Sequence, residues 1–192
     1  ILNDKYKVFH VSRSNKFESS NFIKWDWLSK DGLNLEAKDI DTVIFFPKPS
    51  SMDEIGYING FINSSENIYR EFCNLKINKF ISISSTRVYD KQDNQMSYES
   101  EEISTEEFRG KIIRKYEEQQ ENFYGKKLII LRLSGLYDAS SNKMPRNCLH
   151  RKNAAQAIKF FIDKDFNFTD CEIFNCSEAV SYTHLTLPTS YP

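Results

Sequence analysis

Four of the strand-like runs in this sequence are followed by segments with polar side chains that can bind a ligand or move a proton. They are Ser12, Arg13 and Ser14 after one run, residues 47–50 (PKPS, beginning at Pro47) after another, residues 84–90 (SSTRVYD) after a third and residues 134–138 (SGLYD) after a fourth. Hydroxyl and guanidinium groups bind phosphates and sugar hydroxyls, and a tyrosine hydroxyl can donate a proton to a reacting oxygen. Each segment taken alone has the composition of an ordinary turn, because Ser and Asp favour loops. The ordered set is what predicts a binding site.

Strands and helices alternate along the chain and would bring these segments together. Runs rich in β-branched and aromatic residues predict strands at residues 6–12, 22–27, 42–46, 79–84, 127–133 and 172–175. Apolar spacing predicts helices at residues 55–75 and 154–162, and a further helix that opens with a capping box at 104–107 (STEE) and has Phe108, Ile112, Tyr116 and Phe123 on its core face. This order is typical of an α/β fold with a doubly wound parallel sheet, in which ligands bind beyond the carboxyl ends of the strands.

Composition limits the classes of protein to which the chain can belong. Its 192 residues suit one domain, and 40% hydrophobic residues are enough for a core. Basic and acidic residues number 26 and 27, and the net charge is −1. The sequence therefore has no excess of positive charge that would indicate binding to nucleic acid or to an anionic membrane. No apolar run is long enough to span a membrane. With 6 glycines and 5 prolines, the sequence as given contains no glycine-rich phosphate loop.

The cysteines indicate a reducing compartment. They are Cys73, Cys148, Cys171 and Cys176. They form no CxxC pair, and a chain of this size needs no disulfides to fold, so we expect free thiols and a cytoplasmic protein. The histidines show no ligand spacing relative to the cysteines, which argues against a zinc site.

Both ends of the sequence depart from what a whole native domain would show. The chain starts at Ile1, directly before a strand-like run, without the layout of a signal peptide. Residues 180–192 (VSYTHLTLPTSYP) lack charge, and residues 180–189 are similar to a translated transposon-end sequencing adapter. We therefore expect a partial domain over residues 1–179 and a non-native tail over 180–192, with a natural disordered C-terminus as the alternative.

Four segments carry a family resemblance. They are residues 79–90 (KFISISSTRVYD), 128–138 (LIILRLSGLYD), 147–158 (NCLHRKNAAQAI) and 172–178 (EIFNCSE). In order and spacing they resemble the extended and atypical short-chain dehydrogenase/reductase superfamily, in particular its NAD(P)-dependent epimerase/dehydratase group. The resemblance implies a Rossmann-type doubly wound parallel sheet that lacks its first strand here, because that strand and its glycine-rich loop would precede Ile1.

The resemblance also shows where the chain departs from the family. The family's catalytic Tyr-x-x-x-Lys pair falls on Arg109 and Ile113, and isoleucine has no charge or donor. The family's hydroxyl beside the substrate carbonyl falls on Ser85, and Tyr89 is the nearest remaining proton donor. A free tyrosine is a weak acid unless a cation lies close, and Arg87 or Arg109 would supply one.

The site residues follow from these alignments and from the strand ends. We predict Ser85 and Tyr89 as catalytic residues. We predict Thr86, Ser134 and Tyr137 as substrate contacts. The predicted cofactor contacts are Ser12, Arg13, Ser14, Pro47 and Ser84. No metal is predicted.

Arg13 indicates which dinucleotide the chain would bind. Sheets of this type that prefer NAD usually carry an acid after this strand, whereas here Ser12 and Arg13 follow it. A guanidinium suits a 2′-phosphate, so NADP is favoured over NAD. The alternative is a solvated surface arginine.

Two functions fit this sequence. The first is an NAD(P)-dependent oxidoreductase or epimerase-like enzyme acting on a small polar substrate. The second is a non-catalytic NADP-binding redox sensor or regulatory protein, which the missing Tyr/Lys pair favours. A soluble α/β domain without a nucleotide is a third reading that the four ordered segments disfavour. The oligomeric state is not predicted.

Overall fold

Parallel β-structure forms the centre of the molecule. The computed structural model describes residues 5–15, 21–29, 31–35, 40–89, 97–100, 105–140 and 147–178. A four-stranded parallel sheet has the order β3 (Thr42–Phe45), β4 (Lys79–Ser85), β5 (Leu128–Leu133) and β8 (Glu172–Cys176). Two short parallel pairs stand apart from it, namely β1 (His10–Ser12) with β2 (Phe22–Lys24), and β6 (Gly135–Tyr137) with β7 (Cys148–His150).

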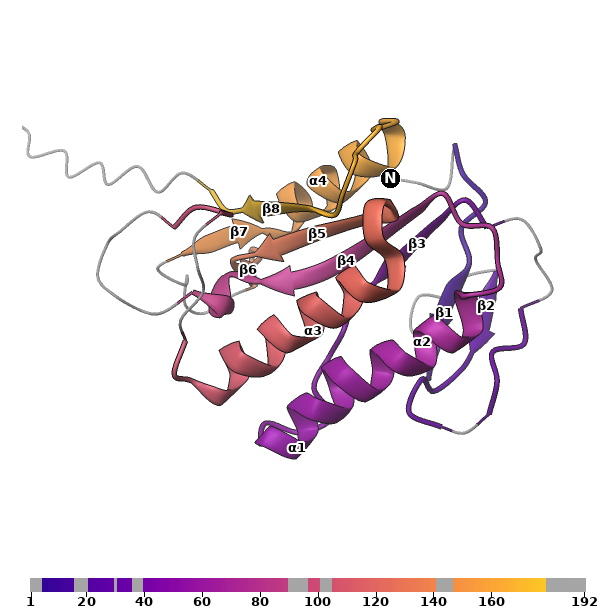
Figure 1. The fold of residues 1–192 in the computed structure, drawn as a ribbon, viewed down its shortest axis with the longest axis horizontal. Helices are drawn as coiled ribbons and strands as arrows, with labels where there is room; N and C mark the ends of the chain where they lie inside the picture. Colours follow the sequence, from indigo (N-terminus) through magenta and orange to yellow (C-terminus); the bar gives the residue numbers. More distant parts are fainter. Residues whose placement is uncertain are drawn as a thin grey trace, which may run out of the picture.

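Helices cover both faces of the four-stranded sheet, so the predicted doubly wound α/β fold is confirmed (Figure 1). One face carries α1 (Glu54–Tyr57), η1 (Ile58–Asn63), α2 (Ser64–Phe72) and α3 (Phe108–Tyr124), and the other carries α4 (Arg151–Asp163). The short helices η2 (Thr86–Val88) and η3 (Gly125–Lys127) lie in connections. Within the described residues β3 pairs with β4 alone and β1 with β2 alone, so no strand joins these two sheets. This agrees with the predicted sheet that lacks its first strand.

The alternation of side chains along β4 builds a core on each face. Phe80 packs with the apolar cluster beneath α2 and α3, whereas Ile81 and Ile83 pack with the cluster beneath α4. On the α3 face, Ser82 and Ser84 are buried and bond to Tyr116 and Glu117 of α3. The strand is therefore buried on both faces, as expected for a central parallel strand.

The long helix predicted over residues 55–75 forms as α1, η1 and α2, with a π-helical turn in the middle. Gly60 lies where this helix passes the loop after β3, and a Cβ atom there would come 2.1 Å from the Lys48 carbonyl oxygen. Only glycine permits this approach, which holds the loop after β3 against the helix.

The start of α3 corrects the sequence prediction. Glu107 is the N-cap residue and makes no side-chain capping bond, so the predicted capping box does not open the helix; Ser104 lies outside the described residues. The buried face also differs, because Phe108 and Phe123 are only partly buried while Glu117 and others lie deep. The polar side chains of the sheet beneath α3 require a polar partner, and this requirement overrides the apolar pattern.

Other differences concern short elements. The strands predicted at residues 6–12 and 22–27 are reduced to His10–Ser12 and Phe22–Lys24. The pair β6–β7 was not predicted, since three-residue strands are too short for a period-2 pattern to be read. The tail predicted over residues 180–192 lies outside the described residues.

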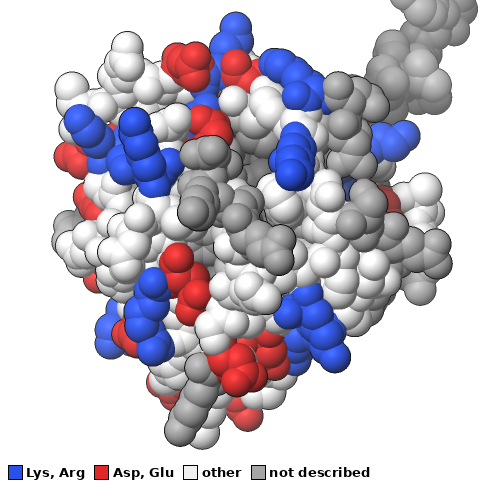
Figure 2. Space-filling model, turned by 90° about the vertical axis from the view of Figure 1, so that its right-hand side faces the viewer, with Lys and Arg blue, Asp and Glu red and all other residues white. Residues whose placement is uncertain are grey.

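No helix in the described part of the chain is long and apolar enough to cross a membrane. Among the described residues on the face shown in Figure 2, basic side chains (blue) and acidic side chains (red) are interspersed.

Lys79 joins the sheet to α4. The side chain is 9% exposed, and Nζ donates to the carbonyl oxygens of Phe161 at 2.6 Å, Ile162 at 3.1 Å and Lys164 at 2.8 Å. A cation at a helix C-terminus satisfies carbonyl groups that have no partner within the helix. Lys79 therefore fixes the end of α4 against the start of β4.

We expect Lys79→Met to lower the free energy of unfolding by about 1–3 kcal/mol, because it leaves buried carbonyl oxygens without a donor. Urea unfolding followed by circular dichroism measures this change. The matched control is Lys76→Met on an exposed position, for which we expect a change within about 0.5 kcal/mol. Equal losses in the two variants would contradict the capping role.

Candidate functional site

The carboxyl ends of three neighbouring strands bring several predicted residues together. Ser85 ends β4 and pairs in register with Leu133 at the end of β5, so Ser134 follows on the adjacent strand. Thr86 begins the short helix η2 directly after β4. Pro47 follows β3, whose last residue pairs with Ser82 of β4. These residues lie along one edge, where parallel sheets bind ligands.

Ser12 ends β1 of the separate two-stranded sheet, and Arg13 and Ser14 follow it. The Ser12 hydroxyl donates to the Ser14 carbonyl oxygen at 2.7 Å. Arg13 is exposed, and it makes no ion pair with any residue that the structure describes. No hydrogen bond of the described chain joins this segment to the four-stranded sheet. The predicted roles of all three in cofactor binding stay predictions.

The turn after β4 presents hydroxyl groups at the sheet edge. Ser85 Oγ accepts the Arg87 backbone N–H at 3.2 Å and so caps η2. Thr86 Oγ1 accepts a long bond of 3.5 Å from the Asn147 side chain. Both hydroxyls act as acceptors here, and among the described residues neither donates to an acceptor. Their hydrogens are therefore available to a ligand oxygen.

Ser134 and Tyr137 follow β5 in different surroundings. Ser134 is 4% exposed, and its hydroxyl has no hydrogen-bond partner in the described part of the chain. An unpaired buried hydroxyl costs about 1–3 kcal/mol, so a ligand that bonds it would gain affinity. The Tyr137 hydroxyl instead donates to Glu178 Oε2 at 2.8 Å. The pKa of Glu178 is lowered, first by the His150 backbone N–H and then by the Tyr137 hydroxyl.

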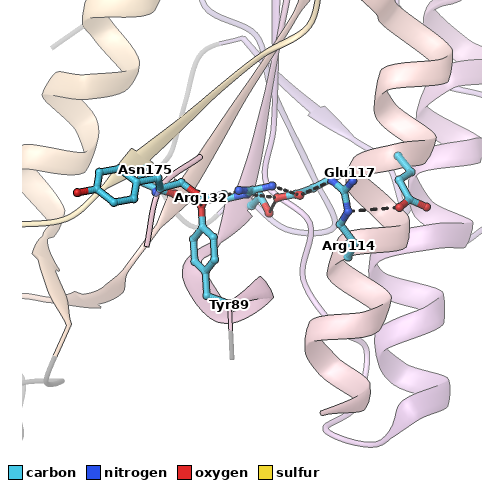
Figure 3. A network of polar contacts seen from close by, with 8 residues as sticks. Tyr89, Arg114, Glu117, Arg132 and Asn175 are labelled. Carbon is cyan, nitrogen blue, oxygen red and sulfur yellow. Dashed lines mark hydrogen bonds and ion pairs between the residues drawn. The ribbon is translucent and has the colours of Figure 1, made fainter. Parts of the chain in front are cut away.

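A buried ion pair lies behind this edge (Figure 3). Glu117 of α3 and Arg132 of β5 are each 1% exposed and form a bidentate pair, with Arg132 Nε 2.9 Å from Oε1 and Nη2 2.8 Å from Oε2. Ser84 donates to the same Oε1 at 2.6 Å. Ser84, a predicted cofactor contact, thus gives its hydrogen to Glu117, and its cofactor role stays a prediction.

The same arginine reaches Tyr89. Arg132 Nη1 donates to the Tyr89 hydroxyl at 2.7 Å, and this hydroxyl donates to Asn175 Oδ1 at 2.9 Å (Figure 3). Burial by itself would lower the pKa of Arg132, but hydrogen bonds and the charge of Glu117 outweigh it and raise that pKa. The guanidinium beside Tyr89 is therefore permanently charged.

This arrangement corrects the predicted cation beside Tyr89. The sequence pointed to Arg87 or Arg109, whereas the structure places Arg132 there. Arg87 and Arg109 instead flank Glu107, at 3.1 and 3.7 Å. The catalytic role of Tyr89 itself stays a prediction.

Glu117 and Arg132 are the site residues that sequence reasoning missed. A signal was present, because Arg132 interrupts the apolar run LIILRL of a central strand. A charge in such a run must be paired, since an isolated buried ion costs several kcal/mol. The sequence does not say which acidic residue supplies the partner.

We expect Glu117→Gln to lower the free energy of unfolding by about 3–5 kcal/mol, because it leaves the buried Arg132 guanidinium without its carboxylate. Arg132→Met should cost less, because Arg114 Nη1 lies 3.6 Å from Glu117 Oε2 and keeps a cation beside the carboxylate. The double variant should lose less than the sum of the two. Urea unfolding of the four proteins measures this coupling.

Lys111→Met provides the comparison for an exposed pair, since Lys111 and its partner Glu106 are 55% and 92% exposed. Its cost should stay within about 1 kcal/mol. Additive losses for the double variant would show that the two buried side chains are not coupled.

Solved structures of known enzymes share this fold. UDP-glucuronic acid 4-epimerase from Bacillus cereus, in complex with NAD, matches with a TM-score of 0.68 and 18% identity, over 84% of this chain and 62% of that one. UDP-N-acetylglucosamine 4-epimerase from Methanobrevibacter ruminantium M1 matches with a TM-score of 0.64 and 19% identity, over 82% and 61%. UDP-N-acetylglucosamine 4-epimerase from Bacillus cereus matches with a TM-score of 0.68 and 20% identity, over 91% and 69%.

These similarities establish the fold. The chain spans about three fifths of the length of the first two epimerases. No protein-family model matches the sequence. No curated protein is similar to it in sequence. The predicted Rossmann-type architecture of the short-chain dehydrogenase/reductase epimerases is therefore confirmed as a fold.

Proposed function

We propose that this protein binds a nicotinamide dinucleotide and a small polar, sugar-nucleotide-like substrate, and that it acts as an oxidoreductase or epimerase-like enzyme. The observation that carries the proposal is the edge formed by Ser85, Thr86 and Ser134 at the carboxyl ends of β4 and β5. It supplies two hydroxyl donors and one buried unpaired hydroxyl. The fold is shared with epimerases of UDP-sugars, one of them solved with NAD.

The cofactor would lie between β1 and this edge. Arg13 is exposed and has no acidic partner among the described residues, which fits a 2′-phosphate and favours NADP over NAD. Ser12 and Ser14 would contact the ribose that carries this 2′-phosphate. Pro47 and Ser84 would line the approach to the nicotinamide. Bound NADP would supply the hydride chemistry that protein side chains lack.

The substrate would lie against the turn after β4. Ser85 donates a hydrogen bond to a polar group at the reacting carbon, and Thr86, Ser134 and Tyr137 contact the rest. Tyr89 acts as proton donor, and its phenolate would be stabilised by the Arg132 guanidinium at 2.7 Å.

The four thiols form no disulfide in the structure, which favours the cytoplasm as location.

The second function, binding of NADP without turnover, is favoured by Ile113. This residue, at the position of the family's lysine by the resemblance, is 2% exposed and belongs to the core cluster. It cannot contact a ribose or lower the pKa of a neighbouring acid. A protein in which isoleucine replaces the family's lysine would signal cofactor occupancy or redox state to a partner.

We expect Arg13→Ala to weaken NADPH binding about 10- to 100-fold, the loss expected for one or two charge-assisted hydrogen bonds, and NADH binding by no more than about twofold. Fluorescence titration of the reduced dinucleotides measures both constants. Arg70→Ala, on the exposed surface of α2, is the matched control. Equal losses for NADPH and NADH would reject the role of Arg13.

Turnover separates the two functions. With UDP-sugars and a panel of carbonyl compounds, we expect NADPH oxidation or sugar epimerisation that Ser85→Ala lowers by about 10² or more, without a change in NADPH affinity. Ser29→Ala, in a loop outside the sheet edge, should leave the rate unchanged. NADPH binding without any turnover would reject the enzyme and favour the sensor.

A further inference from the structure

Two arginines meet at the amino end of α3, beside the turn after β4. Arg87 of η2 and Arg109 of α3 lie on either side of a single carboxylate, that of Glu107. Their side chains are 38% and 28% exposed, so a dissolved ligand can reach both. This group is called the arginine pair below.

The carboxylate occupies only one of the two guanidinium groups. Arg87 Nη1 donates to both Glu107 oxygens, at 3.1 and 3.3 Å. Arg109 Nη1 is 3.7 Å from Glu107 Oε1, which is too long for a hydrogen bond. Within the described residues Arg109 makes no hydrogen bond, and its Nε is buried without an acceptor. A buried donor without an acceptor is unfavourable, so Arg109 retains unused hydrogen-bonding capacity.

The Arg109 guanidinium and the backbone of Arg87 are held in place without that acceptor. The Arg109 guanidinium carbon lies over the rings of Tyr57 and Phe108, at 5.7 and 5.4 Å from their centroids. The backbone of Arg87 is fixed by the Ser85 hydroxyl and by close contact with α3, where a Cβ on Gly110 would come 2.8 Å from the Arg87 carbonyl oxygen. Binding to this pair therefore costs little side-chain ordering.

The local charge favours an anion. Among the described residues Glu106 is paired with Lys111, so the arginine pair and Glu107 leave one positive charge in excess. The amino end of α3 adds partial positive charge, because Glu107 makes no side-chain cap there. The planar guanidinium fork matches the geometry of carboxylates and phosphates.

We propose that Arg87 and Arg109 bind an oxyanion group, a phosphate or a carboxylate, of the substrate. Glu107 holds the pair in the free protein, and the oxyanion takes the unused donors of Arg109. The Ser85 hydroxyl bonds the backbone of Arg87, so the arginine pair is connected directly to the turn after β4. That the oxyanion belongs to the substrate rests on the proposed function; the binding of an oxyanion does not.

The direct test is a titration of the chain, labelled at the arginine Nε positions, with inorganic phosphate and separately with acetate, at constant ionic strength. We expect saturable NMR shifts of the Arg87 and Arg109 Nε–H signals and none for Arg70. Arg109→Gln should weaken the oxyanion about tenfold or more, whereas Arg109→Lys should retain part of the affinity. Arg70→Gln should change nothing, and the melting temperature of each variant checks folding.

Glu107→Gln should change the oxyanion affinity in the direction opposite to Arg109→Gln. It removes the competing carboxylate, so we expect oxyanion binding about 2- to 5-fold tighter, by the energy of an exposed ion pair. If the three side chains only stabilise the fold, Glu107→Gln should not raise the affinity for the oxyanion. Absence of a saturable shift at both arginines, or a loss of affinity in Glu107→Gln with an unchanged melting temperature, would overturn the proposal.

A second titration distinguishes the source of the oxyanion. UDP-glucuronic acid and UDP-glucose share the diphosphate and differ by the sugar carboxylate. If Arg109→Gln weakens both, the pair binds the phosphate; if it weakens only UDP-glucuronic acid, the pair binds the carboxylate; if it weakens neither, the pair is not part of the substrate site. Phosphate binding without turnover would leave the oxyanion site intact and remove the proposed enzyme activity.

Discussion

The geometry of the sheet edge depends on the buried ion pair between Glu117 and Arg132. Two charges that are each 1% exposed are tolerated because they pair at bidentate hydrogen-bond distances, and Arg114 lies a further 3.6 Å from the same carboxylate. Ser84 and Tyr89 complete the arrangement from β4 and the segment after η2. The ion pair therefore joins α3 to β5, and the hydrogen bonds of Ser84 and Tyr89 connect β4 and the segment after η2 to it.

The ion pair also sets the rotation of α3. Residues four apart share a face of a helix, so fixing Glu117 against the sheet directs Ile113 into the core one turn earlier. Arg109 lies two turns earlier, in the first turn of the helix, where it meets Tyr57 and Glu107 beside η2. The close contact of Gly110 with the Arg87 carbonyl brings the second arginine to the same place. The position of the arginine pair thus follows from a buried contact more than one helical turn away.

Sequence reasoning recovered the parts of this molecule that repeat a pattern. The central strands are rich in β-branched and aromatic residues, and the alternation of strands and helices specifies a parallel sheet, so the architecture and the edge with Ser85 and Ser134 could be predicted. The start of α3 could not, because STEE has the composition of a capping box whether or not the backbone uses it. The cation beside Tyr89 could not either, since Arg132 is 43 residues away in sequence and only the pairing of β4 with β5 brings it close.

The chemistry available at α3 is binding rather than proton transfer. A guanidinium stays protonated throughout the physiological range, so Arg109 can hold an anion but cannot exchange a proton with it. Ile113 offers neither charge nor hydrogen bond. Of the two residues proposed as catalytic, Ser85 and Tyr89, only Tyr89 has a cation in contact that could stabilise its anion. In the proposed function, therefore, α3 would bind the substrate and the end of β4 would carry the reacting groups.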